Sequence, residues 1–209
     1  MWVVIPHVGK SHLTVRLLES IPTSNTPLVV DASWLGDLSA YSKIRGHIQY
    51  LRAPVHDCLA KNWNRGARAV PESEDAWMFC ATDIEFSYEV WTNLPALMEK
   101  YPQAGIFRVG PNWGAFVMRR WCWDRIGPVD ETYAPCGGED AEILFRCWRE
   151  KIPIRNQYLP MLHMEGGHAG RKDGRADRER NIAHFRENWG CDPSWNDPTF
   201  RRAVKETAC

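Results

Sequence analysis

The sequence has no net charge, no long apolar run and no paired cysteine motif. Its 26 Lys and Arg residues balance its 26 Asp and Glu residues, so no overall field would draw nucleic acid or an anionic membrane to the protein. Its seven cysteines are an odd number and form no Cys-x-x-Cys pair, which argues against a disulfide scaffold and against a structural zinc site. A reducing, cytoplasmic setting is therefore expected.

A membrane-spanning segment and a signal peptide are also missing. No apolar stretch approaches the ~20 residues that a transmembrane helix needs, and Met1 leads directly into a short strand-like run without a basic leader. Internal repeats and low-complexity linkers are absent as well. We therefore expect one domain over residues 1–209, large enough for a substantial core and without a membrane span.

Short apolar runs alternate with amphipathic segments along the chain. The expected strands cover residues 2–5, 27–30, 47–51, 76–80, 105–109, 114–119 and 154–163. The expected helices cover residues 11–21, 58–69 and 88–100, a segment that opens at 138, and a final helix at 177–189. This order predicts an α/β fold, a single Rossmann-like domain with a mainly parallel central sheet flanked by helices.

Acidic residues follow two of the expected strands. Asp31 comes directly after one apolar run, and Asp83 and Glu85 follow another. Because ligands of an open parallel sheet bind beyond the carboxyl ends of its strands, these acids should converge on one edge. Carboxylates there suit Mg²⁺ or Mn²⁺ held together with phosphate oxygens, and His163 ends the last expected strand. Taken alone, the acidic pair is explained equally well as the start of the following helix.

The segment Ala134–Arg149 carries a second acidic pair. Two glycines form a turn, and Glu139 and Asp140 then open an amphipathic helix. The helix macrodipole stabilises acids in the first turn by roughly 0.3–1 kcal/mol each, so a structural role is sufficient if the segment is taken alone. The same position predicts that Asp140 is ionised at neutral pH.

These motifs, in this order, resemble those of GT-A fold glycosyltransferases, in particular the family-2-like inverting enzymes of small, stand-alone bacterial or phage type. Val3–Pro6 is similar to their opening strand, Val29–Ser33 to their second-strand segment, and Asn62–Gly66 to the helix beside the nucleotide. Ala81–Glu85 stands where these enzymes carry an Asp-x-Asp metal motif.

The resemblance continues through the second half of the chain. Arg125–Glu131 is similar to the Gly-x-Phe-Asp-Glu segment of the family, Gly138–Asp140 to its Glu-Asp acceptor-site motif, and His163 to its late histidine. The Trp113–Gly114 pair is similar to one in galactosyl- and N-acetylgalactosaminyltransferases of related GT-A families. The resemblance covers roughly residues 1–189, and the correct order of six motifs makes it specific.

The resemblance implies a hexosyltransferase that moves a sugar from a nucleoside diphosphate sugar, with a UDP-sugar the expected donor, to an acceptor hydroxyl with inversion. It implies that Asp140 is the general base and that Mn²⁺ or Mg²⁺ neutralises the leaving diphosphate. The residues it assigns are Asp83, Glu85 and His163 for the metal; Pro6, Asp31, Asn62, Arg65 and Asp83 for the nucleotide; and Glu139, Gly138 and Trp113 for the acceptor or donor sugar. The candidates for contact with the diphosphate are Arg65, Arg171, Lys172 and Arg175.

The same resemblance divides the domain into a nucleotide-binding half at about 1–85, an acceptor-binding half at about 86–190, and a C-terminal helix and tail at 177–209. Two other interpretations stay open. One is a nucleotidyltransferase on a similar sheet, for which His7–Ser11 is only a faint signature loop. The other is a non-catalytic module that binds a nucleotide or a sugar. The acceptor is open among protein, glycan, small molecule and modified DNA.

Overall fold

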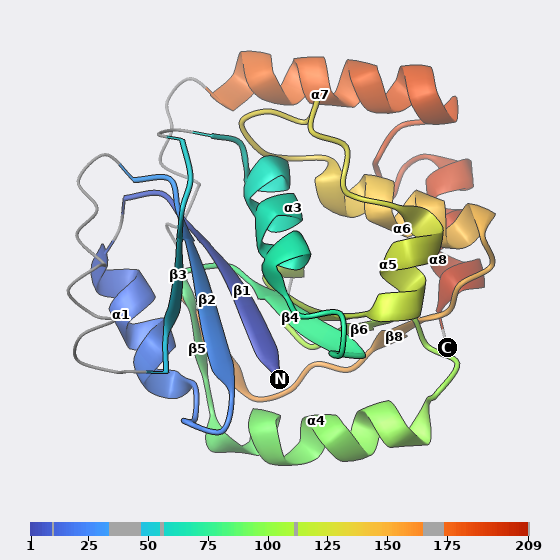
Figure 1. Cartoon of the computed structure of the whole chain (residues 1–209). Helices are drawn as coiled ribbons and strands as arrows, with labels where there is room; N and C mark the ends of the chain where they lie inside the picture. Colours follow the sequence, from blue (N-terminus) through green and yellow to red (C-terminus); the bar gives the residue numbers. More distant parts are fainter. Residues whose placement is uncertain (10, 34–46, 55–56, 111–112, 165–173, 209) are drawn as a thin grey trace.

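The protein is an α/β domain built on one mixed, mostly parallel sheet (Figure 1). Its structure is a computed structural model that describes residues 1–209 except 10, 34–46, 55–56, 111–112, 165–173 and 209. The predicted fold class is confirmed within these residues. None of the helices in this part of the chain is long and apolar enough to span a membrane.

The central sheet has seven strands, which are, in spatial order, β3 (Gln49–Arg52), β2 (Thr26–Asp31), β1 (Trp2–His7), β4 (Ala76–Cys80), β7 (Ala115–Arg119), β6 (Ile106–Arg108) and β8 (Ile154–Asn156). Parallel pairs join β3 to β2, β2 to β1, β1 to β4 and β6 to β8. Only β7 runs antiparallel to its neighbours β4 and β6. It therefore begins at the edge of the sheet where β4 and β6 end.

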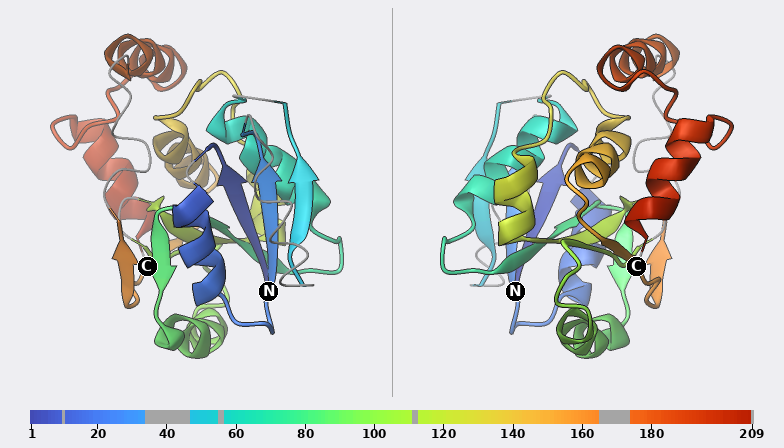
Figure 2. Two further views of the ribbon diagram at one scale, coloured as in Figure 1. Left: turned by 90° about the vertical axis from the view of Figure 1, so that its left-hand side faces the viewer. Right: turned by 90° about the vertical axis from the view of Figure 1, so that its right-hand side faces the viewer.

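Helices cover both faces of this sheet. They are α1 (Ser11–Ser20), α3 (Leu59–Ala69), α4 (Tyr88–Lys100), α5 (Arg120–Ile126) and α6 (Glu139–Arg149). The side views show α3 and α4 on opposite sides (Figure 2). Within β1, Val3 and Ile5 pack into the core beneath α1 and α4, whereas Val4 packs into the core beneath α3 and α5. The continuous apolar run of β1 is thus explained by burial on both faces.

The close approach of α3 to the sheet depends on Gly66. A Cβ atom at this position would lie 2.2 Å from Cγ1 of Val4 and 3.2 Å from Cγ2 of Val30. Any side chain would therefore push the helix away from β1 and β2. The helix starts one residue later than expected, with Cys58 as its N-cap.

The expected strand at 154–163 is divided into two strands that belong to different sheets. After β8, the strand β9 (Met161–His163) pairs antiparallel with β5 (Ile84–Phe86) in a separate two-stranded sheet. Between the two strands, the N–H of Leu159 donates to the carbonyl of Val109 at 3.0 Å, and the chain bends at Pro160. This small sheet places His163 opposite Ile84.

The helix expected to be final is followed by another one. α7 (Gly174–Trp189) ends at Trp189, as predicted, and α8 (Pro198–Thr207) follows it. Asp197 is the N-cap of α8 and accepts a hydrogen bond from the N–H of Thr199 at 2.8 Å. Together with Pro198 in the first turn, it is a sufficient signal for a helix start.

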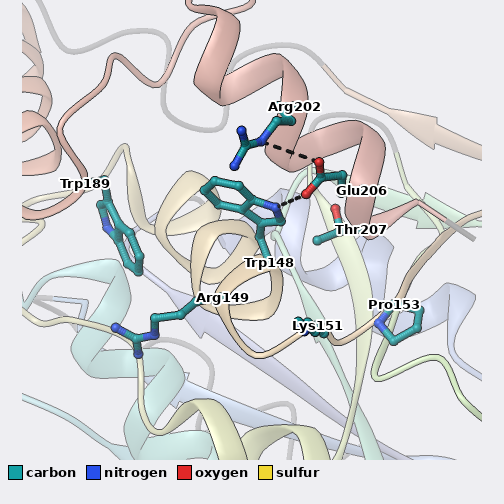
Figure 3. A pocket seen from close by; sticks show the side chains of 8 residues that line it. All are labelled: Trp148, Arg149, Lys151, Pro153, Trp189, Arg202, Glu206 and Thr207. Carbon is teal, nitrogen blue, oxygen red and sulfur yellow. Dashed lines mark hydrogen bonds and ion pairs between the residues drawn. The ribbon is translucent and has the colours of Figure 1, made fainter.

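α8 is joined both to α6 and to the sheet. The indole Nε1 of Trp148 on α6 donates a hydrogen bond to Oε2 of Glu206 at 2.6 Å (Figure 3). Directly after the helix, Ala208 forms a parallel bridge with Ile154 of β8. The ring of Phe145, on α6, stacks on that of Phe200, on α8, with 5.9 Å between their centroids. The last described segment is therefore part of the domain.

Candidate functional site

Polar residues from several strands meet at one edge of the sheet. Asp31 is the last residue of β2, and Asp83 comes shortly after the end of β4. Arg108 ends β6, and Trp113 comes just before β7, which starts at the same edge because it is reversed. The topology thus gathers these residues beyond the carboxyl ends of the parallel strands, where ligands of such sheets bind.

Asp31 is fully buried and is held by three donors. Its carboxylate accepts hydrogen bonds from the N–H of Ser33 at 2.8 Å, from Nη1 of Arg52 at 2.8 Å and from the hydroxyl of Tyr50. Burial acts to raise the pKa of Asp31, but the hydrogen bonds from Ser33 and Tyr50 outweigh it and hold that pKa below its usual value. Asp31 therefore fixes the end of β2 to β3. Pro6, another residue predicted for the nucleotide, lies buried in β1.

The predicted nucleotide-side residues of α3 bind each other. Oδ1 of the buried Asn62 accepts a hydrogen bond from Nη1 of Arg65 at 3.1 Å. Nη2 of Arg65 also forms an ion pair with Oδ2 of Asp57 at 2.5 Å. Arg65 is therefore held by Asn62 and Asp57, and its side chain is 29 % exposed.

The residues predicted for the metal are only partly brought together. Nε2 of His163 lies 3.4 Å from Oδ1 of Asp83, because β9 pairs with β5 immediately after Asp83. Glu85 instead forms an ion pair with Arg16 of α1 at 2.5 Å. Among the described residues, no three His, Cys, Asp or Glu side chains form a cluster that could hold a metal ion.

The Asp83–His163 pair nevertheless fits a divalent ion that shares its coordination with another ligand. Two atoms that each bind one ion at roughly 2.0–2.2 Å lie roughly 3–4 Å apart, and the observed 3.4 Å falls in that range. Mg²⁺ and similar ions commonly take one or two protein ligands and complete their shell with phosphate oxygens and water. The pair would hold one side of such an ion.

The second acidic pair starts α6 after a turn of two glycines. Gly137 and Gly138 have φ values of +101° and +104°, and a Cβ atom on Gly138 would lie 2.7 Å from the ring of Tyr133. Glu139 accepts a hydrogen bond from the N–H of Gly137, and Asp140 accepts one from the N–H of Ala141 at 2.8 Å. The turn therefore requires glycine for both conformation and space.

Burial changes the protonation of both acids. It raises the pKa of Glu139 to about 7, and the negative charge of Asp140 adds to the effect. Burial also raises the pKa of Asp140, against the helix-terminal N–H groups and the positive charge of Arg108. Desolvation thus outweighs the N-terminal hydrogen bonds, and the expectation that the helix start keeps Asp140 ionised at neutral pH stays a prediction.

Three of the predicted residues line one cavity of about 350 Å³. Asp140, Gly138 and Trp113 form part of its wall, and Arg178 and Asn181 of α7 form another part. The arrangement places a carboxylate, an indole and a guanidinium around one space. Glu139 is not among the lining residues of this cavity, because its carboxylate turns back to the glycine turn.

Two residues that sequence reasoning missed support this cavity. Nδ2 of Asn181 donates hydrogen bonds to the carbonyl of Gly137 at 2.8 Å and to that of Cys136 at 3.1 Å. The guanidinium of Arg108 lies over the ring of Trp113 at 4.8 Å, and its charge acts on Asp140. Only the position of Arg108 at the end of an apolar strand was a signal in the sequence, whereas nothing linked Asn181 to the glycine turn.

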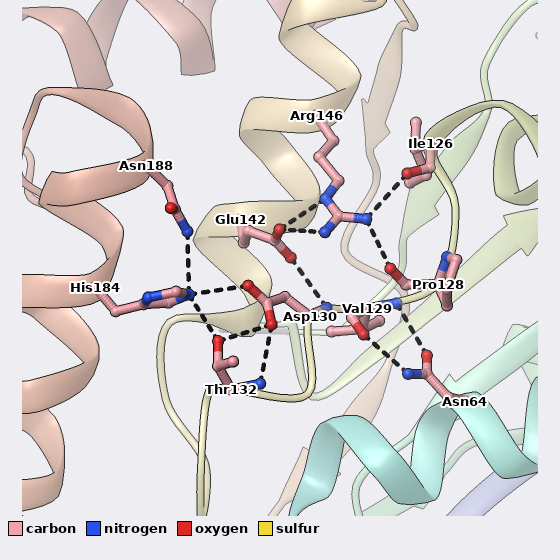
Figure 4. Close-up of polar contacts among 10 residues, drawn as sticks. All are labelled: Asn64, Ile126, Pro128, Val129, Asp130, Thr132, Glu142, Arg146, His184 and Asn188. Carbon is pink, nitrogen blue, oxygen red and sulfur yellow. Dashed lines mark hydrogen bonds and ion pairs between the residues drawn. The ribbon is translucent and has the colours of Figure 1, made fainter.

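The loop between α5 and the glycine turn is fixed to α3 and α6 (Figure 4). Asn64 of α3 exchanges two hydrogen bonds with the backbone of Val129, at 2.8 and 2.9 Å. Arg146 of α6 donates to the carbonyls of Ile126 and Pro128 at 3.0 and 2.7 Å, and it pairs with Glu142 of its own helix. The segment resembling the family's Asp-Glu motif is thereby held in place.

The same loop is also tied to α7 through His184. Nε2 of His184 lies 2.9 Å from Oδ2 of Asp130, 2.6 Å from Oγ1 of Thr132 and 3.0 Å from Nδ2 of Asn188 (Figure 4). Burial acts to raise the pKa of Asp130, but the hydrogen bonds from His184 and Thr132 outweigh it and lower that pKa. α7 thus braces both ends of the segment that leads into α6.

Some candidates from the sequence cannot be placed. Arg171 and Lys172 lie outside the described residues, as does Lys10 of the segment His7–Ser11, and the side chain of Arg175 is not described. The diphosphate contacts proposed for the basic segment therefore stay predictions.

Comparison with known proteins relates the chain to glycosyltransferases by fold. No protein-family profile matches the sequence, and a search of curated proteins by sequence finds no match. The mannosyltransferase PcManGT from Pyrobaculum calidifontis, in complex with GDP-Man and Mn²⁺, superposes on 98 % of this chain and 68 % of its own, with a TM-score of 0.68 and 15 % identity.

A second similar structure is that of TarS residues 1–349 from S. aureus in complex with UDP. It matches 70 % of this chain and 54 % of its own, with a TM-score of 0.58 and 13 % identity. The chain thus spans about half the length of that TarS structure. At these identities the comparisons establish a shared fold, that of glycosyltransferases whose structures hold a nucleotide or a nucleotide sugar.

Proposed function

We propose that this protein is a metal-assisted glycosyltransferase that moves a sugar from a nucleoside diphosphate sugar to an acceptor hydroxyl, with Asp140 as the general base. The observation that carries the proposal is the cavity in which the carboxylate of Asp140 faces Trp113 and Arg178 at the ligand-binding edge of the sheet. The shared fold with PcManGT and TarS supports the reaction class.

Asp140 has the properties of a base for a hydroxyl proton. Its raised pKa brings it closer to neutral pH, where a general base is most effective because it is both ionised and a good proton acceptor. The backbone N–H groups of the helix start and the charge of Arg108 oppose that rise. The indole of Trp113 lines the same cavity as the carboxylate, so it can contact a sugar ring bound there.

Asp83 and His163 are the residues proposed to hold the ion. A divalent cation bound there would neutralise charge on the leaving nucleoside diphosphate. The imidazole of His163 is a poorer ligand for Mg²⁺, which prefers oxygen, and this favours Mn²⁺. Glu85 is the third predicted ligand, and it would have to leave Arg16 in order to reach the ion.

Nucleotide binding is proposed for the edge formed by β1, β2 and α3. Arg65 keeps donors available for a phosphate, since guanidinium groups bind phosphate oxygens in a bidentate manner. Asp31 would act on the ligand through Ser33 and Arg52, which it holds, because its own carboxylate is already engaged. We propose the nucleotide-binding half at about 1–85, with a UDP-sugar as donor, and the acceptor-binding half at about 86–190.

The test is a donor screen combined with a variant of the base. UDP-, GDP- and TDP-sugars are added with and without Mn²⁺, and thermal shift and release of free nucleotide are measured. Asp140→Asn should lower the rate by roughly 10²–10⁴-fold and leave the donor-induced thermal shift in place. Asp124→Asn, on the exposed surface of α5, is the matched control.

Two outcomes contradict the proposal. If no nucleotide sugar shifts the melting temperature with any divalent ion, the donor site is absent. If the donor binds but Asp140→Asn turns over as fast as the wild type, the protein is a binding module or uses another base.

A further inference from the structure

A second cavity, of about 750 Å³, lies at the C-terminal end of α6 (Figure 3). Its wall combines two indoles, three cations and one carboxylate, which are Trp148, Trp189, Arg149, Lys151, Arg202 and Glu206. None of these residues takes part in the site proposed for sugar transfer. The cavity has the size of a small-molecule site, for which ≈ 300–1,000 Å³ is typical.

The aromatic part of the wall packs against the buried ring of Phe145. The ring of Phe145 lies 5.4 Å from that of Trp148 and 5.3 Å from that of Trp189, measured between centroids. The guanidinium of Arg202 lies over the ring of Trp148 at 5.1 Å, and that of Arg149 lies over the ring of Trp189 at 5.4 Å. Both indoles are thus packed from behind and each carries a cation.

The polar groups of the wall supply both donors and acceptors. Glu206 accepts a hydrogen bond from Nε1 of Trp148 at 2.6 Å, and its other oxygen lies 3.5 Å from Nε of Arg202. Arg149 shares its charge with Glu150 at 3.6 Å, and Lys151 is exposed beside it. The cavity therefore carries a net positive charge together with a fixed carboxylate that can accept hydroxyl protons.

We propose that this cavity is a binding site for an anionic saccharide, a sugar chain that carries carboxylate or phosphate groups. The guanidinium and ammonium groups would bind the anion, the indoles would contact the ring, and Glu206 would accept hydrogen bonds from its hydroxyls. A nucleic acid strand fits less well, because such strands need an extended basic groove, whereas the protein has no net charge.

The second cavity and the proposed transfer site lie on the same helix. α6 has Asp140 in its first turn and Trp148 and Arg149 in its last, and its 11 residues span roughly 16 Å. The two cavities thus lie at opposite ends of one helix. Binding of the saccharide at the second cavity does not depend on sugar transfer, so it can be tested without a donor.

The experiment measures binding of a tetrasaccharide of galacturonic acid by calorimetry and by tryptophan fluorescence. The wild-type protein should bind it, and its methyl ester should bind at least about tenfold more weakly, since each tenfold corresponds to one lost charge-assisted contact. Arg202→Gln should weaken binding by about tenfold, and Arg149→Gln should act in the same direction. Arg201→Gln, one residue earlier on α8 and exposed, is the matched control.

Several results would overturn the site. They are equal affinity for the acid and its methyl ester, no effect of Arg202→Gln, an equal effect of Arg201→Gln, or tighter binding of a hexathymidylate strand. A second variant guards against loss of folding: Trp189→Phe keeps an aromatic ring against Phe145 while it changes the indole face. It should fold as the wild type does and bind the tetrasaccharide more weakly.

Discussion

Two acidic pairs lie at the same side of the protein, and their surroundings differ. Asp83 and Glu85 are separated by their partners, since one meets His163 and the other meets Arg16. Glu139 and Asp140 stay together at the start of a helix, where burial raises the pKa of both. The members of the first pair have separate partners, and those of the second share a desolvated helix start.

The difference separates two kinds of chemistry. A carboxylate next to an imidazole can share a divalent cation with it. A desolvated carboxylate beside one guanidinium is suited to accept and release a proton near neutral pH. Both pairs are close in sequence, and it is the burial of the start of α6 and the small β5–β9 sheet that give them different surroundings.

The largest expected effect comes from replacing Asp83, the residue of the first pair that we propose binds the divalent cation. Asp83→Ala should abolish the Mn²⁺-dependent thermal shift and lower activity by at least ~100-fold, because even changes next to metal ligands cost 10–100-fold. Glu85→Gln should cost less, since Glu85 is engaged by Arg16. If the two variants lose the thermal shift equally, Glu85 is a full ligand and changes partner on binding.

Glu139 of the second pair should lower the free energy of unfolding at neutral pH, because its carboxyl is buried. A carboxyl whose pKa is raised to about 7 on folding contributes stability at low pH that is lost as pH rises through that value. Glu139→Gln should remove this dependence and make the protein more stable than the wild type above about pH 7, by up to roughly 3 kcal/mol at about 1.4 kcal/mol per pKa unit.

Urea unfolding at about pH 5 and about pH 8 measures this effect. Glu99→Gln, on the exposed surface of α4, is the control and should show no such trend. A Glu139→Gln variant whose stability follows the wild type at both pH values would show that Glu139 is not desolvated.

The need for glycine in the turn before Glu139 can be tested by replacing Gly137 and Gly138 separately. Gly137→Ala and Gly138→Ala both force a side chain into positive φ, at a cost of about 1–3 kcal/mol each. Only at Gly138 would the new Cβ meet the ring of Tyr133, at 2.7 Å, whereas nothing lies within 4 Å at Gly137. Gly138→Ala should therefore be the less stable variant by chemical denaturation, and equal losses would contradict the contact.

The smallest expected effect is a shift in pH dependence. The charge of Arg108 lowers the pKa of Asp140, so Arg108→Gln should raise that pKa. The base must be ionised, and the fall of kcat/KM on the acid side should therefore move to higher pH. Arg68→Gln, exposed on α3, should leave the profile unchanged. If the pH profile of Arg108→Gln does not shift, the charge of Arg108 does not act on the pKa of the proposed base Asp140.

The sequence was most informative where local pattern determines structure. The apolar runs predicted the sheet and the helices, since burial on both faces is visible as a continuous run in β1. The direction of β7 was not predictable, because an apolar run carries no direction. α8 was missed although Asp197 and Pro198 mark its start, and the division of residues 154–163 into β8 and β9 was missed because both are short.

The candidate site was only partly predictable for a similar reason. Asp140, Gly138 and Trp113 were selected from motifs, and they line one cavity. Arg108 and Asn181 meet that site only through tertiary packing, which no spacing reveals. The rise in the pKa of Asp140 was not visible in the sequence, because desolvation depends on how the folded chain covers the helix start.

The bridge between Ala208 and Ile154 has a consequence for how the protein behaves in solution. β8 is the outer strand of the sheet, and an outer strand presents unpaired backbone groups that another chain can pair with. Ala208 takes up part of that edge from within the same molecule. Because Ala208 covers part of this edge, a variant shortened before Ala208 should self-associate more readily, as measured by light scattering.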